Sequence, residues 1–323
     1  MAHLILHRKE KQMDNFFTKK HNILIIALIC TALWGSAFPV VKIGYELLQI
    51  KPADIYSKIY FAGLRFFIAS IMVLLIQKIV LKERIHVNRS NLKPIIILGL
   101  LQTSLQYFFF YIGVANTSGI KSAILQSGST FFTVIAAHFI YAEDKLNFNR
   151  VLSLILGFSG VVLVNLGKDL DLSFKFVGEG FLIISALLST VATIYVKSIS
   201  SNINPFLLSG GQMFSGSLLL LIIGKFGLRS NGLNFNTASF SLLLYAAFIS
   251  AAAFTLWYML LKYNPPGKVS VYRLFIPIFG SIFSAMFIKG EQFTLNLIIG
   301  LMLVVLGIFA LNMDNRIRTK PKK

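Results

Sequence analysis

The chain has 323 residues, of which 56% are hydrophobic and only 13% are charged, and its formal net charge is +19. A soluble domain carries about a quarter charged residues, so this composition excludes an ordinary soluble protein and predicts an all-α integral membrane protein. In a soluble protein the positive charge would suggest a nucleic-acid partner. Here the basic residues flank apolar runs, which favours membrane topology and anionic lipid headgroups at the cytoplasmic face, with no nucleic acid.

Ten apolar segments, each of roughly the length that a bilayer span requires, follow one another along the chain. Lipid offers the backbone no hydrogen-bond partner, so each segment is expected to be an α-helix. The polar residues 1–21 and the basic residues 313–323 are expected to form cytoplasmic tails. The ten segments run roughly over 22–43, 59–79, 94–115, 120–141, 151–167, 178–197, 205–226, 239–261, 268–288 and 293–312.

The distribution of lysine and arginine predicts the orientation. With the N-terminus inside, 20 of the 31 basic residues fall in inner loops and tails, and 8 fall in outer loops. The other three, Lys42, Arg65 and Arg273, fall within spans. Because cytoplasmic loops are enriched in lysine and arginine, we expect both termini in the cytoplasm of a plasma or inner membrane.

The chain contains an internal repeat. Shifted by 147 positions, residues 62–165 lie on 209–312 without a gap, and identical pairs include Gly63/Gly210, Tyr111/Tyr258 and Gly160/Gly307. Each repeat holds five spans, an odd number, so the second must enter the membrane from the opposite side to the first. Inverted repeats with a binding site at their interface are typical of secondary transporters. A duplication kept only for folding is the alternative.

The motifs of both halves resemble the EamA-type family of the drug/metabolite transporter superfamily. They are "ALWGSAFPVVK", "LRFFIAS", "FIYAED" and "VSVYRLFIPIFGSIFSAMFIKGEQFTLNLIIGLMLVVLGI". The resemblance implies ten helices in two inverted five-helix repeats, over 22–167 and 178–312, around a central cavity. It also implies export or exchange of small metabolites, often amino acids. The chain departs from the pattern at Thr130, which stands opposite Pro277, at Asp144, opposite Glu291, and at Arg273.

The first span combines an aromatic residue with small residues and a proline. Gly35 and Ser36 let helices approach closely, and Pro39 removes a backbone hydrogen bond, so this span is expected to be bent and tightly packed. Trp34 lies near mid-membrane and not at an interface where tryptophan usually gathers. It is predicted to line a substrate cavity; a tryptophan that fills the bundle interior is the alternative.

Two arginines within spans are candidate substrate contacts, because a guanidinium in the membrane needs water or a partner. Arg65 is predicted to bind a substrate carboxylate or line the outer vestibule, and a structural bond to loop carbonyls is the alternative. Arg273 is predicted to contact an anionic substrate or a counter-ion, and snorkelling to inner-leaflet phosphates is the alternative.

Amides and aromatic residues complete the predicted substrate site. Gln102 and Gln106 lie one turn apart on the third span, a face that is unlikely to suit lipid. Tyr111 and Tyr258 occupy equivalent repeat positions, and Trp257 adjoins the second of them. Such a mixture suits a mostly apolar ligand with a few polar groups.

All 12 acidic residues fall in tails, loops or span ends, so proton coupling through a membrane carboxylate is not expected. His138 is the only histidine well inside a span, where either a proton shuttle or a hydrogen-bonded neutral histidine would fit. No nucleotide-binding, hydrolase or metalloprotease motif occurs, so no cofactor and no enzymatic activity are expected.

The sequence thus predicts a secondary transporter that moves a small organic metabolite, an amino acid or related compound, most simply by export through alternating access. An importer or exchanger of another metabolite class is the alternative within transport. Outside transport, a scaffold, a receptor or an enzyme acting on lipid-linked substrates remains open. The oligomeric state is not readable from the sequence.

Overall fold

The computed structural model describes residues 12–83, 85–117, 119–165, 174–228, 232–289 and 292–313, and every regular element in them is helical. Ten helical units follow in chain order. They are α2 (Lys20–Leu47); α3 (Ile55–Leu75) with η1 (Ile76–Val80); α4 (Arg89–Leu98), η2 (Gly99–Leu105) and α5 (Gln106–Ala115); α6 (Gly119–Ile140); α7 (Phe148–Asn165); η3 (Phe176–Gly180) with α8 (Phe181–Ile199); α9 (Pro205–Phe226); α10 (Thr237–Tyr263); α11 (Pro266–Ser270), η4 (Val271–Leu274) and α12 (Phe275–Phe287); and α13 (Leu295–Asn312).

Nine of these units in the described chain are long and apolar enough to cross a membrane, and the tenth is the shorter apolar helix over 148–164. The ten predicted spans are therefore confirmed. Several helices start at a capping residue, whose side chain accepts a hydrogen bond from an N–H group that the first helical turn leaves free. The Asp54 carboxylate accepts the Ser57 N–H at 3.0 Å, and Asn204 accepts the Phe206 N–H at 2.8 Å before the first-turn Pro205.

Equivalent helices of the two repeats pack antiparallel, which is the geometry that inversion requires. A Cβ on Gly63, near the start of α3, would lie 2.9 Å from Leu221 near the end of α9. A Cβ on Gly210, near the start of α9, would lie 2.9 Å from Leu74 near the end of α3. Each contact joins the residues that are equivalent, at a shift of 147 positions, to those of the other contact. The two halves are therefore related by a pseudo-two-fold axis.

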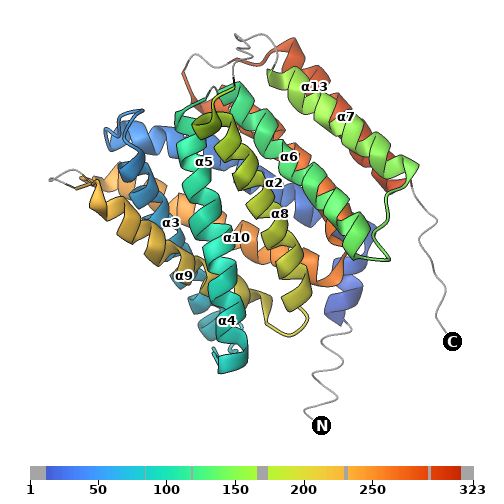
Figure 1. Cartoon of the computed structure of the whole chain (residues 1–323), viewed down its shortest axis with the longest axis horizontal. Helices are drawn as coiled ribbons and strands as arrows, with labels where there is room; N and C mark the ends of the chain where they lie inside the picture. The colour runs from blue at the N-terminus through green and yellow to red at the C-terminus, as the bar shows by residue number, and fades with distance from the viewer. Residues whose placement is uncertain are drawn as a thin grey trace.

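The same reciprocity joins α7 to α13. A Cβ on Gly160 would meet the Gly300 carbonyl, and a Cβ on Gly307 would lie 2.9 Å from the Ser153 carbonyl; the shift exchanges these contacts. Small residues let both helix pairs approach closely. In Figure 1 the α7–α13 pair forms one edge of the bundle and α3, α4 and α9 form the opposite edge, so α2, α5, α6, α8 and α10 occupy the space between them.

The prediction of α-helix throughout was wrong at four short stretches. η1, η2 and η3 are π-helical, and η4 is a 3₁₀ turn within the ninth span. Pro277 has no N–H to give the carbonyl four residues earlier, that of Arg273, and the backbone tightens just before it. By contrast, α2 continues as one helix through Pro39.

Candidate functional site

A cavity of about 380 Å³ lies between the two repeats, a volume within the ordinary range for small-molecule sites. Its walls come from the spans α2, α3, η2–α5, α6, α8, α10 and η4–α12. It extends to the end of α2 and the start of α3, where Tyr45 and Lys58 line it. All eight residues predicted from the sequence line this cavity: Trp34, Arg65, Gln102, Gln106, Tyr111, Trp257, Tyr258 and Arg273. That they bind substrate remains a prediction.

Much of the lining comes from matched positions of the two repeats. The third and eighth spans share five matched lining positions, and the fourth and ninth spans share three. The pairs are Gln102/Ile249, Tyr107/Phe254, Phe110/Trp257, Tyr111/Tyr258, Val114/Leu261, Gln126/Arg273, Ser129/Ile276 and Thr130/Pro277. The pseudo-two-fold axis therefore passes through the cavity.

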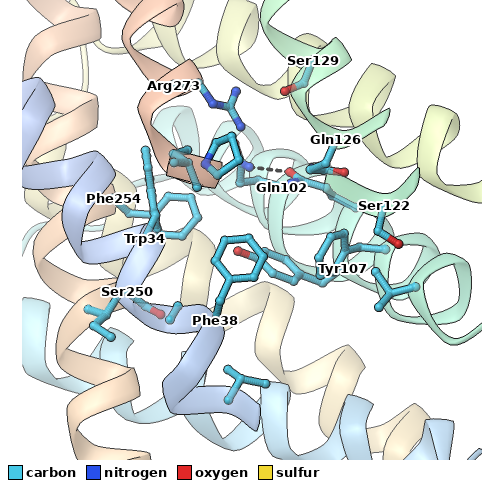
Figure 2. Close-up of a pocket in the computed structure, with 18 of the residues that line it drawn as sticks. Trp34, Phe38, Gln102, Tyr107, Ser122, Gln126, Ser129, Ser250, Phe254 and Arg273 are labelled. Carbon is cyan, nitrogen blue, oxygen red and sulfur yellow. Dashed lines mark hydrogen bonds between the residues drawn. The ribbon is translucent and has the colours of Figure 1, made fainter. Parts of the chain in front are cut away.

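An aromatic wall covers one side. The Trp34 ring lies edge-on to Trp257 and Phe254, with centroids 5.2 Å and 5.5 Å apart. Phe38, one turn beyond Trp34 on α2, faces the same space (Figure 2). Edge-to-face ring pairs are stable without hydrogen bonds, so these three rings present apolar surface to the cavity.

The small residues beside Trp34 serve packing. A Cβ on Gly35 would lie 2.5 Å from the Phe279 Cβ and 2.9 Å from the Gly280 N, so α2 and α12 touch there. Close contact on the Gly35 side of α2 leaves its adjoining face, which carries Trp34, to line the cavity. The small residues and the tryptophan of the first span therefore have separate roles.

The two glutamines form a connected pair on the polar side. Gln102 Nε2 donates to Gln106 Oε1 at 2.5 Å, and both side chains are buried (Figure 2). Gln102 belongs to the π-helical η2, which lies against α9: a Cβ on Gly99 would lie 2.6 Å from the Gln212 carbonyl. The Thr103 hydroxyl also joins η2 to α9, because it donates a hydrogen bond to Gln212 Oε1 at 2.6 Å. This packing holds the glutamine pair at the cavity.

Arg65 is buried, with 6% of its surface exposed, and its guanidinium carbon lies 4.4 Å from the Phe66 ring centroid and 5.6 Å from that of Tyr107. Its Nε has no hydrogen-bond partner among the described residues. Within the described parts of the chain, no hydrogen bond joins Arg65 to a loop carbonyl, which was the alternative role considered above.

Arg273 projects into the same cavity from η4 (Figure 2). One guanidinium nitrogen donates to Ser189 Oγ at 3.0 Å, and its Nε is buried without a partner in the described chain. The 3₁₀ turn that precedes Pro277 sets the position of this side chain. Gln126, its repeat partner, faces it across the cavity (Figure 2).

Polar atoms without a protein partner are concentrated here. Among the described residues ten buried side-chain atoms lack a hydrogen bond, and five of them belong to residues that line the cavity. Buried polar groups are normally paired, so the residues that carry these atoms form an incompletely paired polar region around the cavity. The five atoms are Tyr45 Oη, Arg65 Nε, Gln126 Oε1, Tyr258 Oη and Arg273 Nε.

Acidic groups and His138 lie away from this lining. None of the lining residues in the described chain is aspartate or glutamate. His138 is near the end of α6, where its Nδ1 accepts the Leu146 N–H at 3.0 Å. It therefore fits the hydrogen-bonded alternative. Glu291, with its neighbour Gly290, lies outside the described residues.

The prediction from the sequence missed several lining residues, notably Tyr107, Phe254, Gln126 and Phe38. The repeat carries a signal for two of them: Tyr107 and Phe254 are equivalent and lie one turn before Tyr111 and Tyr258. Phe38 follows Trp34 by four residues on one helical face. Extending each predicted residue by one turn would have found all three.

Comparison with known proteins agrees with this architecture. An uncharacterized transporter of Archaeoglobus fulgidus is 27% identical over 287 residues, covering 88% of this chain and 96% of the relative. The uncharacterized transporter YoaV of Bacillus subtilis is 24% identical over 291 residues, covering 89% and 95%. A solved crystal structure with 13% sequence identity superposes with a TM-score of 0.76, covering 91% of this chain and 98% of that one, which shows the shared fold.

The model of the EamA-like transporter family matches twice, over residues 21–166 and 176–313. The two matches correspond to the two five-helix repeats and together cover most of the chain. This multi-pass membrane protein is therefore a transporter of the drug/metabolite transporter superfamily, and it belongs to the EamA-like transporter family.

Proposed function

We propose that this transporter exports a small organic metabolite, an amino acid or related compound, across the plasma or inner membrane by alternating access. The observation that carries the proposal is the cavity of about 380 Å³, built from matched positions of two inverted repeats. A site on a pseudo-two-fold axis reaches either side of the membrane when the two halves exchange conformations.

The lining is asymmetric in a way that supports alternation. The second half of α2 contributes Trp34, Phe38 and Tyr45 to the cavity, whereas the corresponding half of α8 contributes Thr193. In inverted repeats these half-helices point to opposite membrane faces, so the cavity opens at one face and is closed at the other. With both termini in the cytoplasm, as the basic residues favour, the open face is the outer one.

Contacts between helix ends and a neighbouring loop support closure of the other face. The Asp144 carboxylate, between α6 and α7, accepts the Gly267 N–H of α11 at 2.6 Å. Lys197, near the end of α8, donates to the Lys262 carbonyl of α10 at 3.2 Å. These contacts would have to separate before a ligand could leave the cavity toward the cytoplasm.

Counterflow in proteoliposomes tests the proposal, with amino acids, purines and quaternary amines as the compounds offered. Ala37→Trp, which fills the cavity from α2, is expected to abolish the flux of any transported compound. Leu218→Trp, on the outer surface of α9 where Leu218 is 41% exposed, is the matched control and should retain it. Equal flux through both variants would overturn the proposal.

A further inference from the structure

The charge of the cavity indicates the class of substrate. Three cations line it, Lys58, Arg65 and Arg273, and the described lining contains no carboxylate. Asp54, which is outside the lining and one turn before Lys58, partly balances the charge of Lys58, so the two arginines carry the uncompensated charge. Lys58 lies at the mouth, where its ammonium donates to the Pro52 carbonyl at 2.5 Å. The two arginines lie deeper, and neither has an ion pair with another residue in the described parts of the chain.

A buried guanidinium without an anionic partner is unfavourable, because burial removes the water that stabilises its charge. Arg65 has two aromatic rings against it, and Arg273 has the Ser189 hydroxyl, but each retains an unpartnered Nε. Elsewhere in the described chain a buried arginine is paired: Arg150 lies 2.6 Å from the Asp144 carboxylate. Arg65, which is buried, and Arg273, which is half-buried, are thus the cavity guanidinium groups that have no anion from the described chain.

We propose that the cavity selects organic anions: molecules with a carboxylate or phosphate head, held by Arg65 or Arg273, and an apolar or aromatic body against Trp34 and Trp257. This inference rests on the proposed function and narrows its substrate class to acidic amino acids and related organic acids, which carry a net negative charge, in place of amino acids without net charge. Guanidinium groups bind both types of oxyanion through two parallel hydrogen bonds. An ammonium group would meet only amide, hydroxyl and aromatic partners here and would be repelled by two cations, so cations and zwitterions bind less well.

The proposal has an energetic consequence. An anion that crosses without a compensating ion carries net charge, so the inside-negative membrane potential drives it outward. The potential is worth about 2.3 kcal/mol per charge per 100 mV, which corresponds to an equilibrium concentration ratio of roughly 50-fold. Export would then need no proton carrier, which agrees with a lining without carboxylates.

The experiment measures efflux from proteoliposomes for compounds that share a phenyl body and differ in charge. The anions are 3-phenylpropionate and phenyl phosphate, which separate the two oxyanion heads. The zwitterion is phenylalanine, the neutral compound is 3-phenylpropanamide and the cation is phenyltrimethylammonium. The efflux rate from liposomes without protein is subtracted from each rate, and valinomycin with a potassium gradient sets the membrane potential.

We expect at least one anion to move about tenfold faster than the other three classes, and faster with an inside-negative than an inside-positive potential. If the amide, the cation or phenylalanine moves as fast as both anions, the anion proposal is wrong while transport itself stands. Anion efflux that does not respond to potential would overturn the electrogenic step. If no compound moves, both this inference and the proposed function fail for molecules of this size.

Arginine variants separate selection from structure. Arg65→Gln and Arg273→Gln are expected to lower anion efflux about tenfold or more and to reduce the preference for the anion over the amide. Arg65→Lys and Arg273→Lys, which keep the charge, should restore part of that preference. If the arginines had a merely structural role, their substitution would instead lower the efflux rates of all compounds by the same factor. Lys225→Gln, at the exposed end of α9, is the control that should leave both rate and preference unchanged.

Discussion

Phe67 and Phe214 occupy the same position in the two repeats, and their rings touch, with centroids 5.8 Å apart and planes 33° to each other. A residue in contact with its own repeat partner must lie close to the axis that relates the halves. Gly63 and Gly210, four residues earlier on each helix, make the reciprocal contacts beside this pair. The interface of α3 and α9 is therefore built around the pseudo-two-fold axis.

Glycines at this interface are expected to resist substitution. A Cβ on Gly224 would lie 2.6 Å from the Tyr60 N and 2.7 Å from its Cα, both backbone atoms that a side-chain rotation does not move. Gly224→Ala should cost about 1–3 kcal/mol through overpacking. Gly128→Ala, whose nearest neighbour would be Phe132 at 3.8 Å, should be neutral or slightly stabilising. Thermal unfolding in detergent measures both, and equal melting temperatures would contradict the packing argument.

The aromatic wall is expected to contribute to binding rather than to folding. Trp34→Ala and Trp257→Ala each remove a ring at the cavity and should cost about 1–3 kcal/mol of binding free energy, or roughly 5- to 150-fold in affinity. Melting temperature and expression, measured alongside, should change less. Leu218→Ala on the outer surface should alter neither quantity. Normal transport by both tryptophan variants would make the wall a packing feature only.

The buried ion pair of Asp144 and Arg150 should be strongly coupled. Asp144 and Arg150 are 0% and 2% exposed, so Asp144→Asn leaves a buried guanidinium without its anion and should cost about 3–5 kcal/mol. The double variant Asp144→Asn with Arg150→Gln should be less damaged than the sum of the single variants. A double-mutant cycle on thermal unfolding measures the coupling, and simple additivity would refute it.

Inversion places equivalent loops on opposite sides of the membrane. Lys51 follows the first span and Asn202 follows the sixth, and both are exposed in the structure. On a Cys30→Ala background, an impermeant thiol reagent applied to intact cells should label Lys51→Cys and spare Asn202→Cys. Labelling of both would contradict the inverted topology, and labelling of Asn202→Cys alone would reverse the predicted orientation.

Transport should not depend on a proton gradient. For a compound that does not itself titrate, a transmembrane pH difference is expected to change counterflow by less than about twofold, and His138→Gln should behave like the original protein. The reason is that His138 bonds to the Leu146 backbone and that the described lining contains no carboxylate. A large loss in either measurement would identify a proton-carrying group that the cavity lining does not contain.

The sequence by itself determined the membrane class, the ten spans and the repeat, because span length and apolar composition are local properties that lipid enforces. It also indicated eight residues of the cavity lining, since amides, arginines and paired aromatics do not suit a lipid-facing position. The family resemblance agreed with the two five-helix repeats, which the family match then confirmed.

Only the tertiary structure decided which helix faces meet and which of them line the cavity. The π-helical turn at Gln102 and the 3₁₀ turn at Arg273 depend on contacts between helices and on one missing N–H, and neither changes the apolar pattern. The second halves of α2 and α8 give the cavity different side chains, Trp34, Phe38 and Tyr45 against Thr193. Contacts between residues far apart in the chain, such as that of the Asp144 carboxylate with the Gly267 N–H, depend on how the helices pack, which the apolar pattern of the spans does not specify.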